Sequence, residues 1–182
     1  NCMQRLANGE DPYDVFDDVS DFNDGFAAVE LNGKYNFINT RGELLCNEWF
    51  DYCCDFSNGF ATVQLSGKCN FINTRRELLC NKWFDWCDNF RDGFASVKLS
   101  GKWNFINTRG ELLCNEWFDS CGYFFDGFAA VKLTGKWNFI NTRGELLCNE
   151  WFDLCGNFYD GFAKVELNGK YFRIDTKGQL HN

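Results

Sequence analysis

The sequence predicts an all-β fold built as a tandem array of five 34-residue repeats. Three observations lead to this prediction. The motif Asp-Gly-Phe-Ala, once written Asn-Gly-Phe-Ala, returns every 34 residues without an insertion. Glycine turns divide each period into short apolar runs of strand length, and no helical periodicity appears within the repeats. The glycines of the motif are Gly25, Gly59, Gly93, Gly127 and Gly161.

The composition is that of a folded domain with an acidic surface. The 182 residues can bury a continuous core, and 19% aromatic residues argue against disorder. A formal net charge of −8 without a basic run disfavours nucleic acid as a partner. No apolar run reaches the roughly 18 residues of a membrane span, so we expect no membrane insertion.

A short extension precedes the repeats. Residues 1–12 fall outside the period, and residues 13–182 form the repeat domain, which is close to five full periods cut in the middle of a repeat. Only residues 2–6 are expected to form a turn of helix. Because the first residue is Asn1 rather than methionine, we expect a processed chain or a fragment. The compartment stays open, with the cytoplasm favoured over secretion or the cell surface.

Each repeat contains a predicted β-hairpin. In the first copy, residues 26–31 and 34–39 form the two strands, and Asn32-Gly33 joins them. Both turn residues tolerate the positive φ angles of a type I′ turn. The other copies keep the glycine, which stands at Gly67, Gly101, Gly135 and Gly169.

A second turn follows the hairpin. Residues 39–42 are expected to form a type I turn that ends on Gly42 in the left-handed region and returns the chain into residues 43–45. Arg76 replaces this glycine in one copy at a cost on the order of 1 kcal/mol, so that turn should strain or re-form. A last short strand is expected around residues 50–53, which gives three or four strands per repeat.

The copies also separate packed from variable positions. Positions with one residue in every internal copy are expected to be packed: Ala27, Val29, Leu31, Phe37, Ile38, Leu44, Trp49 and Phe50. The positions of Ala28 and Glu30 vary, so they should face water or a groove. The copies of Ala28 are Thr62, Ser96, Ala130 and Lys164. A repeat this small cannot cover its own aromatic face, so neighbouring repeats must stack.

Residues 126–144 read Asp-Gly-Phe-Ala-Ala-Val-Lys-Leu-Thr-Gly-Lys-Trp-Asn-Phe-Ile-Asn-Thr-Arg-Gly. This run resembles the WG (KWG) repeat family of bacterial proteins, whose repeats have Gly-(Leu/Phe)-Ala-x-Val, then Gly-Lys-Trp-Gly-(Phe/Tyr)-Ile and a glycine turn. The resemblance implies a bacterial origin and a repeat scaffold, without a defined activity. The chain departs from the family at two positions. The family's glycine after tryptophan is Asn36, Asn70, Asn104, Asn138 and Phe172 here, and its tryptophan becomes Tyr35, Cys69 and Tyr171 in three copies.

Two architectures can bury such repeats. An open superhelical stack with divergent end repeats is favoured, and Val15, Arg173 and Asp175 fit such ends. A closed five-bladed β-propeller is the alternative, since the leading partial repeat would complete the trailing one. A blade of 34 residues would be shorter than the roughly 40 to 50 residues usual in propellers.

The eleven cysteines mostly form two series that lie seven residues apart within each repeat. The series are Cys46, Cys80, Cys114 and Cys148, then Cys53, Cys87, Cys121 and Cys155. Their spacing and the near absence of histidine disfavour a metal site, and we expect no metal and no cofactor. Buried free thiols are favoured over disulfides, which would require secretion.

No residue pattern predicts catalysis. The single histidine, His181, lies one residue from the end of the chain, where a Cys-His or Ser-His pair would be mobile. Glu43 and Asp51 recur in copy after copy, whereas acid/base catalysis needs two carboxylates in different environments. We expect Glu43 to pair with an arginine or lysine and Asp51 to cap a turn. The chain is therefore predicted to have no catalytic residues and not to be an enzyme.

Positions that vary within fixed surroundings predict a binding strip just before the Asp-Gly turn. Its candidate residues are Tyr52, Trp86, Tyr123, Phe125, Leu154 and Tyr159. A protein partner is the favoured interpretation, because extended repeat surfaces suit large partners. Binding of a glycan is the alternative, because aromatic rings stack on sugars and a repeated site gains avidity. Self-association, as end-to-end assembly into filaments, is a third hypothesis.

Overall fold

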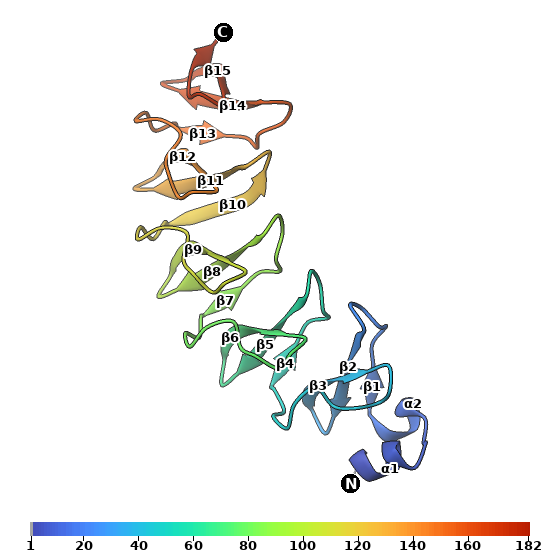
Figure 1. Cartoon of the computed structure of the whole chain (residues 1–182). Coiled ribbons are helices and arrows are strands. Elements are labelled where there is room, and N and C mark those ends of the chain that lie inside the picture. The colour runs from blue at the N-terminus through green and yellow to red at the C-terminus, as the bar shows by residue number, and fades with distance from the viewer. Residues whose placement is uncertain (1) are drawn as a thin grey trace. The chain divides into compact units, whose positions relative to one another are not determined.

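The computed structural model of the chain describes residues 2–182, so Asn1, the first residue of the predicted extension, lies outside the described residues. The chain divides into two compact units, Asn1–Phe90 and Arg91–Asn182. Strands dominate both units, and the first also holds two short helices (Figure 1). The strands pair antiparallel in repeated small open sheets. The predicted all-β class is confirmed.

The first unit contains two helices and two complete three-stranded sheets. The helices are α1 (Cys2–Ala7) and α2 (Pro12–Val15). The sheets have the strand orders β1-β2-β3 and β4-β5-β6. Their strands are β1 (Asp18–Val19), β2 (Phe26–Leu31), β3 (Lys34–Asn39), β4 (Tyr52–Cys53), β5 (Phe60–Leu65) and β6 (Lys68–Asn73), and β7 (Trp86–Cys87) ends the unit.

The second unit begins with the hairpin of β8 (Phe94–Leu99) and β9 (Lys102–Asn107). A three-stranded sheet, β10-β11-β12, and a four-stranded sheet, β13-β14-β15-β16, follow it in chain order (Figure 1). The strands are β10 (Ser120–Phe125), β11 (Phe128–Leu133), β12 (Lys136–Asn141), β13 (Leu154–Cys155), β14 (Phe162–Leu167), β15 (Lys170–Asp175) and β16 (Leu180–His181).

The hairpin predicted for each repeat is confirmed in register and in turn. β2 pairs with β3 from Phe26 opposite Asn39 to Leu31 opposite Lys34. The φ angle at Gly33 is 71°, and the preceding residue is at 52°, as a type I′ turn requires. The same register recurs in the other four copies.

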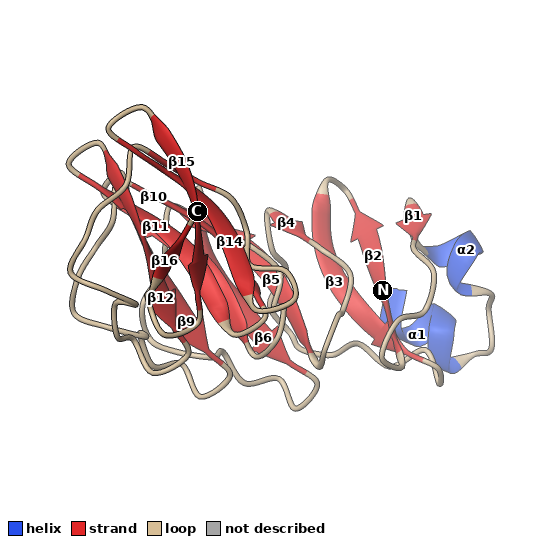
Figure 2. Cartoon of the chain, turned by 90° about the horizontal axis from the view of Figure 1, so that it is seen from above, coloured by secondary structure: helices blue, strands red, loops and turns tan. Residues whose placement is uncertain are grey.

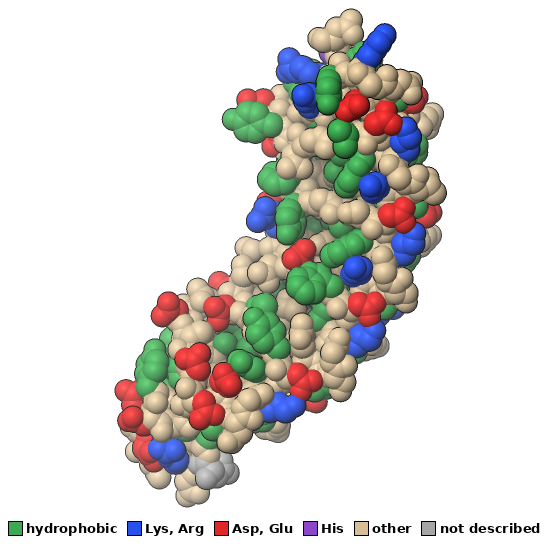
Figure 3. Space-filling view, turned by 180° about the vertical axis from the view of Figure 1, so that it is seen from behind, with side chains coloured by type: hydrophobic (Ala, Val, Ile, Leu, Met, Phe, Trp, Pro, Cys, Tyr) green, Lys and Arg blue, Asp and Glu red, His purple; other side chains and the backbone are tan. Residues whose placement is uncertain are grey.

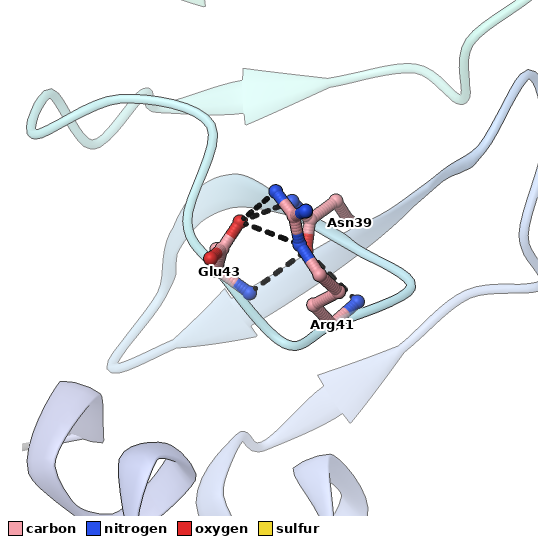
Figure 4. A network of polar contacts seen from close by, with 3 residues as sticks. All are labelled: Asn39, Arg41 and Glu43. Carbon is pink, nitrogen blue, oxygen red and sulfur yellow. Dashed lines mark hydrogen bonds and ion pairs between the residues drawn. The ribbon is translucent and has the colours of Figure 1, made fainter.

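A side-chain network closes the second turn of the repeat (Figure 4). Asn39 Oδ1 accepts hydrogen bonds from the backbone N–H groups of Arg41 at 2.9 Å and Glu43 at 3.0 Å, and its Nδ2 donates to the Glu43 carboxylate at 2.7 Å. Arg41 forms an ion pair with the same carboxylate at 2.7 Å. The hydrogen bonds from Asn39 and then Arg41 lower the pKa of Glu43. The predicted pairing of Glu43 is confirmed, and the network recurs at Glu77, Glu111 and Glu145.

The second copy keeps the shape of this turn under strain. Arg76 has a φ of 72°, close to the 74° of Gly42, and its N–H donates to the carbonyl of Asn73 at 3.1 Å. Of the two outcomes predicted for this copy, the strained turn is the one observed. A side chain in the left-handed region costs on the order of 1 kcal/mol.

The chain returns from the second turn beside the hairpin without forming a regular strand. Single bridges link Ile38 to Leu44 and Tyr35 to Phe50, and the residues between these bridges loop out. The predicted return of the chain into residues 43–45 is confirmed as one bridge, and the strand expected around residues 50–53 is β4. Something other than a hydrogen-bonded ladder must hold the loop.

A buried asparagine holds the return loop, residues 43–50, against the hairpin. Asn36 Nδ2 donates to the carbonyls of Cys46 at 2.8 Å and Glu48 at 3.0 Å, and its Oδ1 accepts from the N–H of Phe37 at 2.8 Å. All four asparagines at this place are 0% exposed: Asn36, Asn70, Asn104 and Asn138. The departure from the family's glycine is thus a structural device that fastens the return loop to the hairpin.

Within each unit, successive sheets are joined by a phenylalanine that we call the wedge. Phe56 packs against Phe26 and Phe37 of the preceding sheet with ring centroids 5.0 and 4.8 Å apart, and it is 3% exposed. The wedges with corresponding contacts are Phe90, Phe124 and Phe158. Each wedge lies between two rings of the preceding repeat and so supplies the inter-repeat core.

Five of the eight predicted packed positions are confirmed. At most 3% of each of these side chains is exposed: Ala27, Val29, Phe37, Ile38 and Phe50. The prediction is wrong for Leu31, Leu44 and Trp49, which are half-buried, and the copies of Leu44 at Leu78 and Leu146 are 42% and 44% exposed.

The prediction that the copies of Ala28 face water or a groove is wrong for Thr62, Ser96 and Ala130, which are 5–8% exposed. Ala130 shows the reason, because it packs in one cluster with Ala163 and Val165 of the following sheet.

Asp51 joins the hairpin turns of two successive repeats. Its carboxylate accepts a hydrogen bond from the N–H of Ser66 at 2.6 Å and forms an ion pair with Lys34 of the preceding hairpin. The bond from Lys34 and then that from Ser66 lower the pKa of Asp51. The predicted turn-capping role is confirmed, and Asp119 and Asp153 repeat it.

The two helices cover the first sheet (Figure 2). Leu6 of α1 packs against the cluster that contains Val29, and the helix predicted at residues 2–6 is confirmed. The prediction that the repeat region contains no helix is wrong at α2. Asp11 accepts from the N–H of Tyr13 at 3.0 Å and Pro12 occupies the first turn, which are ordinary signals of a helix start.

On the last sheet, polar side chains occupy the place that a wedge phenylalanine occupies on the other sheets. Arg173 stands at the position of Phe37, and its guanidinium lies 4.1 Å from the ring centroid of Phe162. His181 packs edge-on against the same ring at 5.7 Å. The aromatic surface of this sheet is therefore covered by its own cationic and imidazole groups.

Candidate functional site

A groove in the first unit lies between the sheets β1-β2-β3 and β4-β5-β6. Its volume is about 570 Å³. Its walls include the rings of Tyr35 and Tyr52 and the carboxylates of Asp18, Glu30 and Asp55. No lysine or arginine is among the residues that line it. The groove therefore combines aromatic surface with negative charge.

The two tyrosines are held by specific contacts. Tyr35 in β3 lies opposite Glu30 in β2, and its hydroxyl donates to the Glu30 carboxylate at 3.1 Å. This hydrogen bond raises the pKa of Tyr35. The Tyr35 ring meets the Tyr52 ring edge-to-face with centroids 5.6 Å apart, and Tyr52 is 47% exposed. The ring pair is thus fixed on one side and open to solvent on the other.

The cross-strand pair of Glu30 and Tyr35 has different chemistry in other repeats. Lys98 lies opposite Trp103 and Lys132 lies opposite Trp137. The two lysine ammonium groups are 5.3 and 5.4 Å from the centroids of these rings. A glutamate at this position accepts a hydrogen bond from a tyrosine, whereas a lysine covers a tryptophan.

A second groove, of about 470 Å³, lies on the last sheet. Its walls include Tyr159, Lys164, Tyr171 and Arg173. Tyr171 lies opposite Glu166, whose hydrogen bond raises the pKa of Tyr171. The Lys164 ammonium lies 4.0 Å from the Tyr171 ring centroid. This groove already contains cations that the chain itself supplies.

The residues of the predicted strip are mostly exposed, and the structure places two of them in grooves. Tyr52, Trp86, Tyr123, Leu154 and Tyr159 are 47–78% exposed, and Phe125 is half-buried. Tyr52 lines the first groove and Tyr159 the second, whereas the other four line neither. Binding by these residues stays a prediction.

Sequence reasoning missed the pairing of Glu30 with Tyr35. It placed Glu30 at a position facing water or a groove and treated Tyr35 only as a replacement of tryptophan. The signal is a correlated change between copies, in which glutamate accompanies tyrosine and lysine accompanies tryptophan. The hairpin register turns this correlation into a contact, because the two positions lie directly opposite each other.

The cysteines are reduced, and the histidine is paired with a carboxylate. All eleven cysteines are free thiols. Burial raises the pKa of Cys53 and Cys155 to about 12 and also raises that of Cys87, so these thiols are protonated and weakly nucleophilic at neutral pH. His181 is hydrogen-bonded to Asp175 at 2.8 Å.

The described residues contain neither a candidate metal site nor a candidate membrane span. Among residues 2–182, no group of three or more histidine, cysteine, aspartate and glutamate side chains is placed to hold a metal ion. In the same range, no helix has both the length and the apolar character that crossing a membrane requires.

Comparison with known proteins gives one family. A family model described as WG containing repeat matches residues 15–35, 49–69, 71–103, 105–137 and 151–171, which make up most of the chain. No curated protein matches the sequence.

The similar solved structures are distant. Hsv2 from Kluyvelomyces marxianus is 9% identical with a TM-score of 0.44, over 89% of this chain and 63% of that chain. Apo AztD from Citrobacter koseri is 11% identical with a TM-score of 0.45, over 91% and 58%. A protein of unknown function from Bacteroides caccae is 13% identical with a TM-score of 0.34, over 89% and 78%. The chain spans less than two thirds of the length of the Hsv2 structures that it matches.

Proposed function

Because the chain belongs to the WG containing repeat family, we propose that it is a non-enzymatic scaffold that binds a protein partner through exposed aromatic side chains. One observation carries the proposal. Large aromatic side chains are exposed to solvent although the sheets that carry them are well packed; Trp86 is 52% exposed and Tyr159 is 78% exposed. Figure 3 shows hydrophobic side chains at the surface of one face. Tryptophan and tyrosine commonly supply most of the binding energy of protein interfaces.

The chemistry of the repeated polar groups supports a role without catalysis. The buried thiols are protonated at neutral pH. Glu43 and Asp51 have lowered pKa values because hydrogen bonds and ion pairs in the turns hold them ionised. A general acid or base needs a pKa near the working pH, and these groups have theirs moved away from it.

Replacing Trp86, Tyr123 and Tyr159 together by alanine is expected to weaken partner binding at least about tenfold, because truncating one interface hot spot costs about 2 kcal/mol or more. In-cell crosslinking with mass spectrometry identifies the partner, and calorimetry with the purified partner measures the dissociation constant. Tyr13→Ala is the control, since Tyr13 is an aromatic residue outside the strip and is 67% exposed.

An unchanged dissociation constant in the triple variant would contradict the proposal. A glycan array probed with the same proteins tests the alternative. If no protein partner is found and the chain binds a glycan that the triple variant no longer binds, the partner is a carbohydrate rather than a protein.

We also propose that the repeats form an open superhelical array rather than a closed five-bladed propeller. Support comes from each end of the chain by itself. At the N-terminal end, α1 and α2 cover the first sheet. On the last sheet, Arg173 occupies the wedge site of Phe162. In a ring that site would receive Phe22, which is 47% exposed.

Small-angle X-ray scattering is expected to give a radius of gyration clearly above the roughly 16 Å of a compact chain of this length. An open array places the end repeats far apart, whereas a ring keeps every repeat near the centre. A radius close to that of the compact chain would favour the propeller.

A further inference from the structure

The aromatic position opposite Glu30 holds a cation elsewhere in the chain. In two repeats of the second unit, Lys98 and Lys132 lie 5.3 and 5.4 Å from the ring centroids of Trp103 and Trp137. A cation within about 6 Å of an aromatic face is attracted by the negative potential of the ring. The chain thus uses this cross-strand position to place a positive charge on a ring.

The first repeat keeps the ring and reverses the charge of its partner. Glu30 occupies the place of the two lysines, opposite Tyr35. Its carboxylate accepts the Tyr35 hydroxyl at 3.1 Å and so stays beside the ring. Asp18 and Asp55 line the same groove. This groove has the aromatic part of a cation site and the negative charge to neutralise a cation, while none of its lining residues supplies one.

We propose that the groove of the first unit binds a lysine or arginine side chain from a basic segment of the partner protein, a proposal that rests on the scaffold function above. The cation lies against the rings of Tyr35 and Tyr52 and pairs with Glu30. The volume of about 570 Å³ accommodates a guanidinium group together with its aliphatic stem. Tyr52, a residue of the predicted strip, forms the solvent-exposed side of the site.

The charge distribution of the chain favours a basic partner at this unit. Residues 1–90 contain 15 aspartates and glutamates against 7 lysines and arginines, whereas residues 91–182 contain 11 of each class. Figure 3 shows the corresponding density of acidic side chains near the N-terminal end. Such a field attracts a basic segment and speeds its association, with a rate that falls as salt rises.

Glu30→Lys tests the groove directly. The substitution recreates the lysine and aromatic pair of two other repeats, so the chain fills the site with its own cation and keeps its fold. We expect the dissociation constant of a short fluorescein-labelled peptide of alternating arginine and serine to rise at least about tenfold in anisotropy titrations. Thermal unfolding monitored by circular dichroism verifies that the variant is folded.

Glu166→Lys is the matched control. It makes the same change of net charge at the same position of the last repeat, where Lys164 already covers the ring. We expect it to change the peptide's dissociation constant less than about twofold, because distant surface charges are screened. Equal losses in the two variants would mean that the peptide senses only overall charge and would overturn the proposal.

Two further titrations complete the test. Tyr35→Trp introduces the ring that other repeats carry, and we expect it to tighten peptide binding about twofold, since tryptophan attracts cations best. The small guanidine agmatine is expected to bind at least about tenfold more weakly than the peptide. If agmatine binds as tightly as the peptide, the proposed ligand is wrong, and the groove binds a small organic cation rather than a basic protein segment.

The groove and the scaffold can fail separately. If the peptide binds the natural chain and Glu30→Lys equally, while the triple alanine variant loses its partner, the groove is rejected and the scaffold stands. If Glu30→Lys loses the peptide while the triple variant keeps its partner, the groove stands and the wider strip is rejected.

Discussion

Replacing Phe158 by alanine is expected to lower the free energy of unfolding by about 3 to 5 kcal/mol. The Phe158 side chain is 3% exposed and lies between the rings of Phe128 and Phe139, with centroids 4.6 and 4.9 Å away. The substitution removes buried apolar area and leaves a cavity between two sheets whose backbones are fixed by their ladders. Urea denaturation followed by tryptophan fluorescence and circular dichroism measures the loss.

Two variants serve as controls for this loss. Tyr159→Ala removes the neighbouring ring, which is 78% exposed, and is expected to cost less than about 0.5 kcal/mol. Phe158→Leu keeps part of the volume and is expected to fall between the two. Hydrogen exchange should rise in β11 to β15, because repeats contact only their neighbours. A loss below about 1 kcal/mol for Phe158→Ala would contradict the joining role of the wedge.

Replacing Asn104 by alanine is expected to cost about 3 kcal/mol, because buried polar groups lose their partners. Asn104 is 0% exposed. Its Nδ2 donates to the carbonyls of Cys114 at 2.9 Å and Glu116 at 3.0 Å, and its Oδ1 accepts from the N–H of Phe105 at 2.7 Å. The same denaturation experiment applies, and hydrogen exchange at residues 112–118 shows whether the return loop has detached.

Asn107→Ala is the matched control, because it removes the same side chain together with three hydrogen bonds. Asn107 accepts from the N–H groups of Arg109 and Glu111 and donates to the Glu111 carboxylate, all in an exposed turn. Water can replace these partners, so we expect a cost of about 1 kcal/mol. Equal costs for the two asparagines would mean that burial does not set the energy of the return loop.

The hairpins could be predicted from sequence because their determinants are local. Asn32-Gly33 sits between two runs of equal length, and only a type I′ turn uses two successive positive φ angles there. The return loop could not be predicted in the same way. Its shape depends on the side chain of Asn36, which reaches carbonyls ten and twelve residues away. A pattern of strand-like residues contains no sign of such a contact.

Local sequence patterns also could not predict which side chains a neighbouring repeat buries. Ala130 lies at a variable position, as surface residues do, yet it packs against Ala163 and Val165 of the following sheet and is 8% exposed. Variation is tolerated where this position is packed, because its buried copies, Thr62, Ser96 and Ala130, are all small. The helix α2 was missed for another reason, since the apparent period already extended through Tyr13 and concealed the Asp11-Pro12 start signal.

The candidate groove was partly predictable. Comparison of copies found Tyr52, because that position varies where everything around it is fixed. It could not find Tyr35 and Glu30 as a pair, because their relation follows from the hairpin register and from the edge contact between two rings of different sheets. Variation between copies identifies candidate binding positions, but only the fold shows which of these positions line the same groove.

The wedge has a consequence for how this protein can change over generations. Each wedge and the two rings that receive it belong to successive repeats with the same spacing in sequence, as for Phe26 with Phe56 and Phe128 with Phe158. Recombination that inserts or deletes one whole period therefore leaves every wedge opposite a suitable pair of rings. Residues 93–126 and 127–160 differ at only five positions, as expected of recent copies. The array can lengthen or shorten without compensating mutations, and each new copy brings a fresh cross-strand pair whose charge is free to diverge.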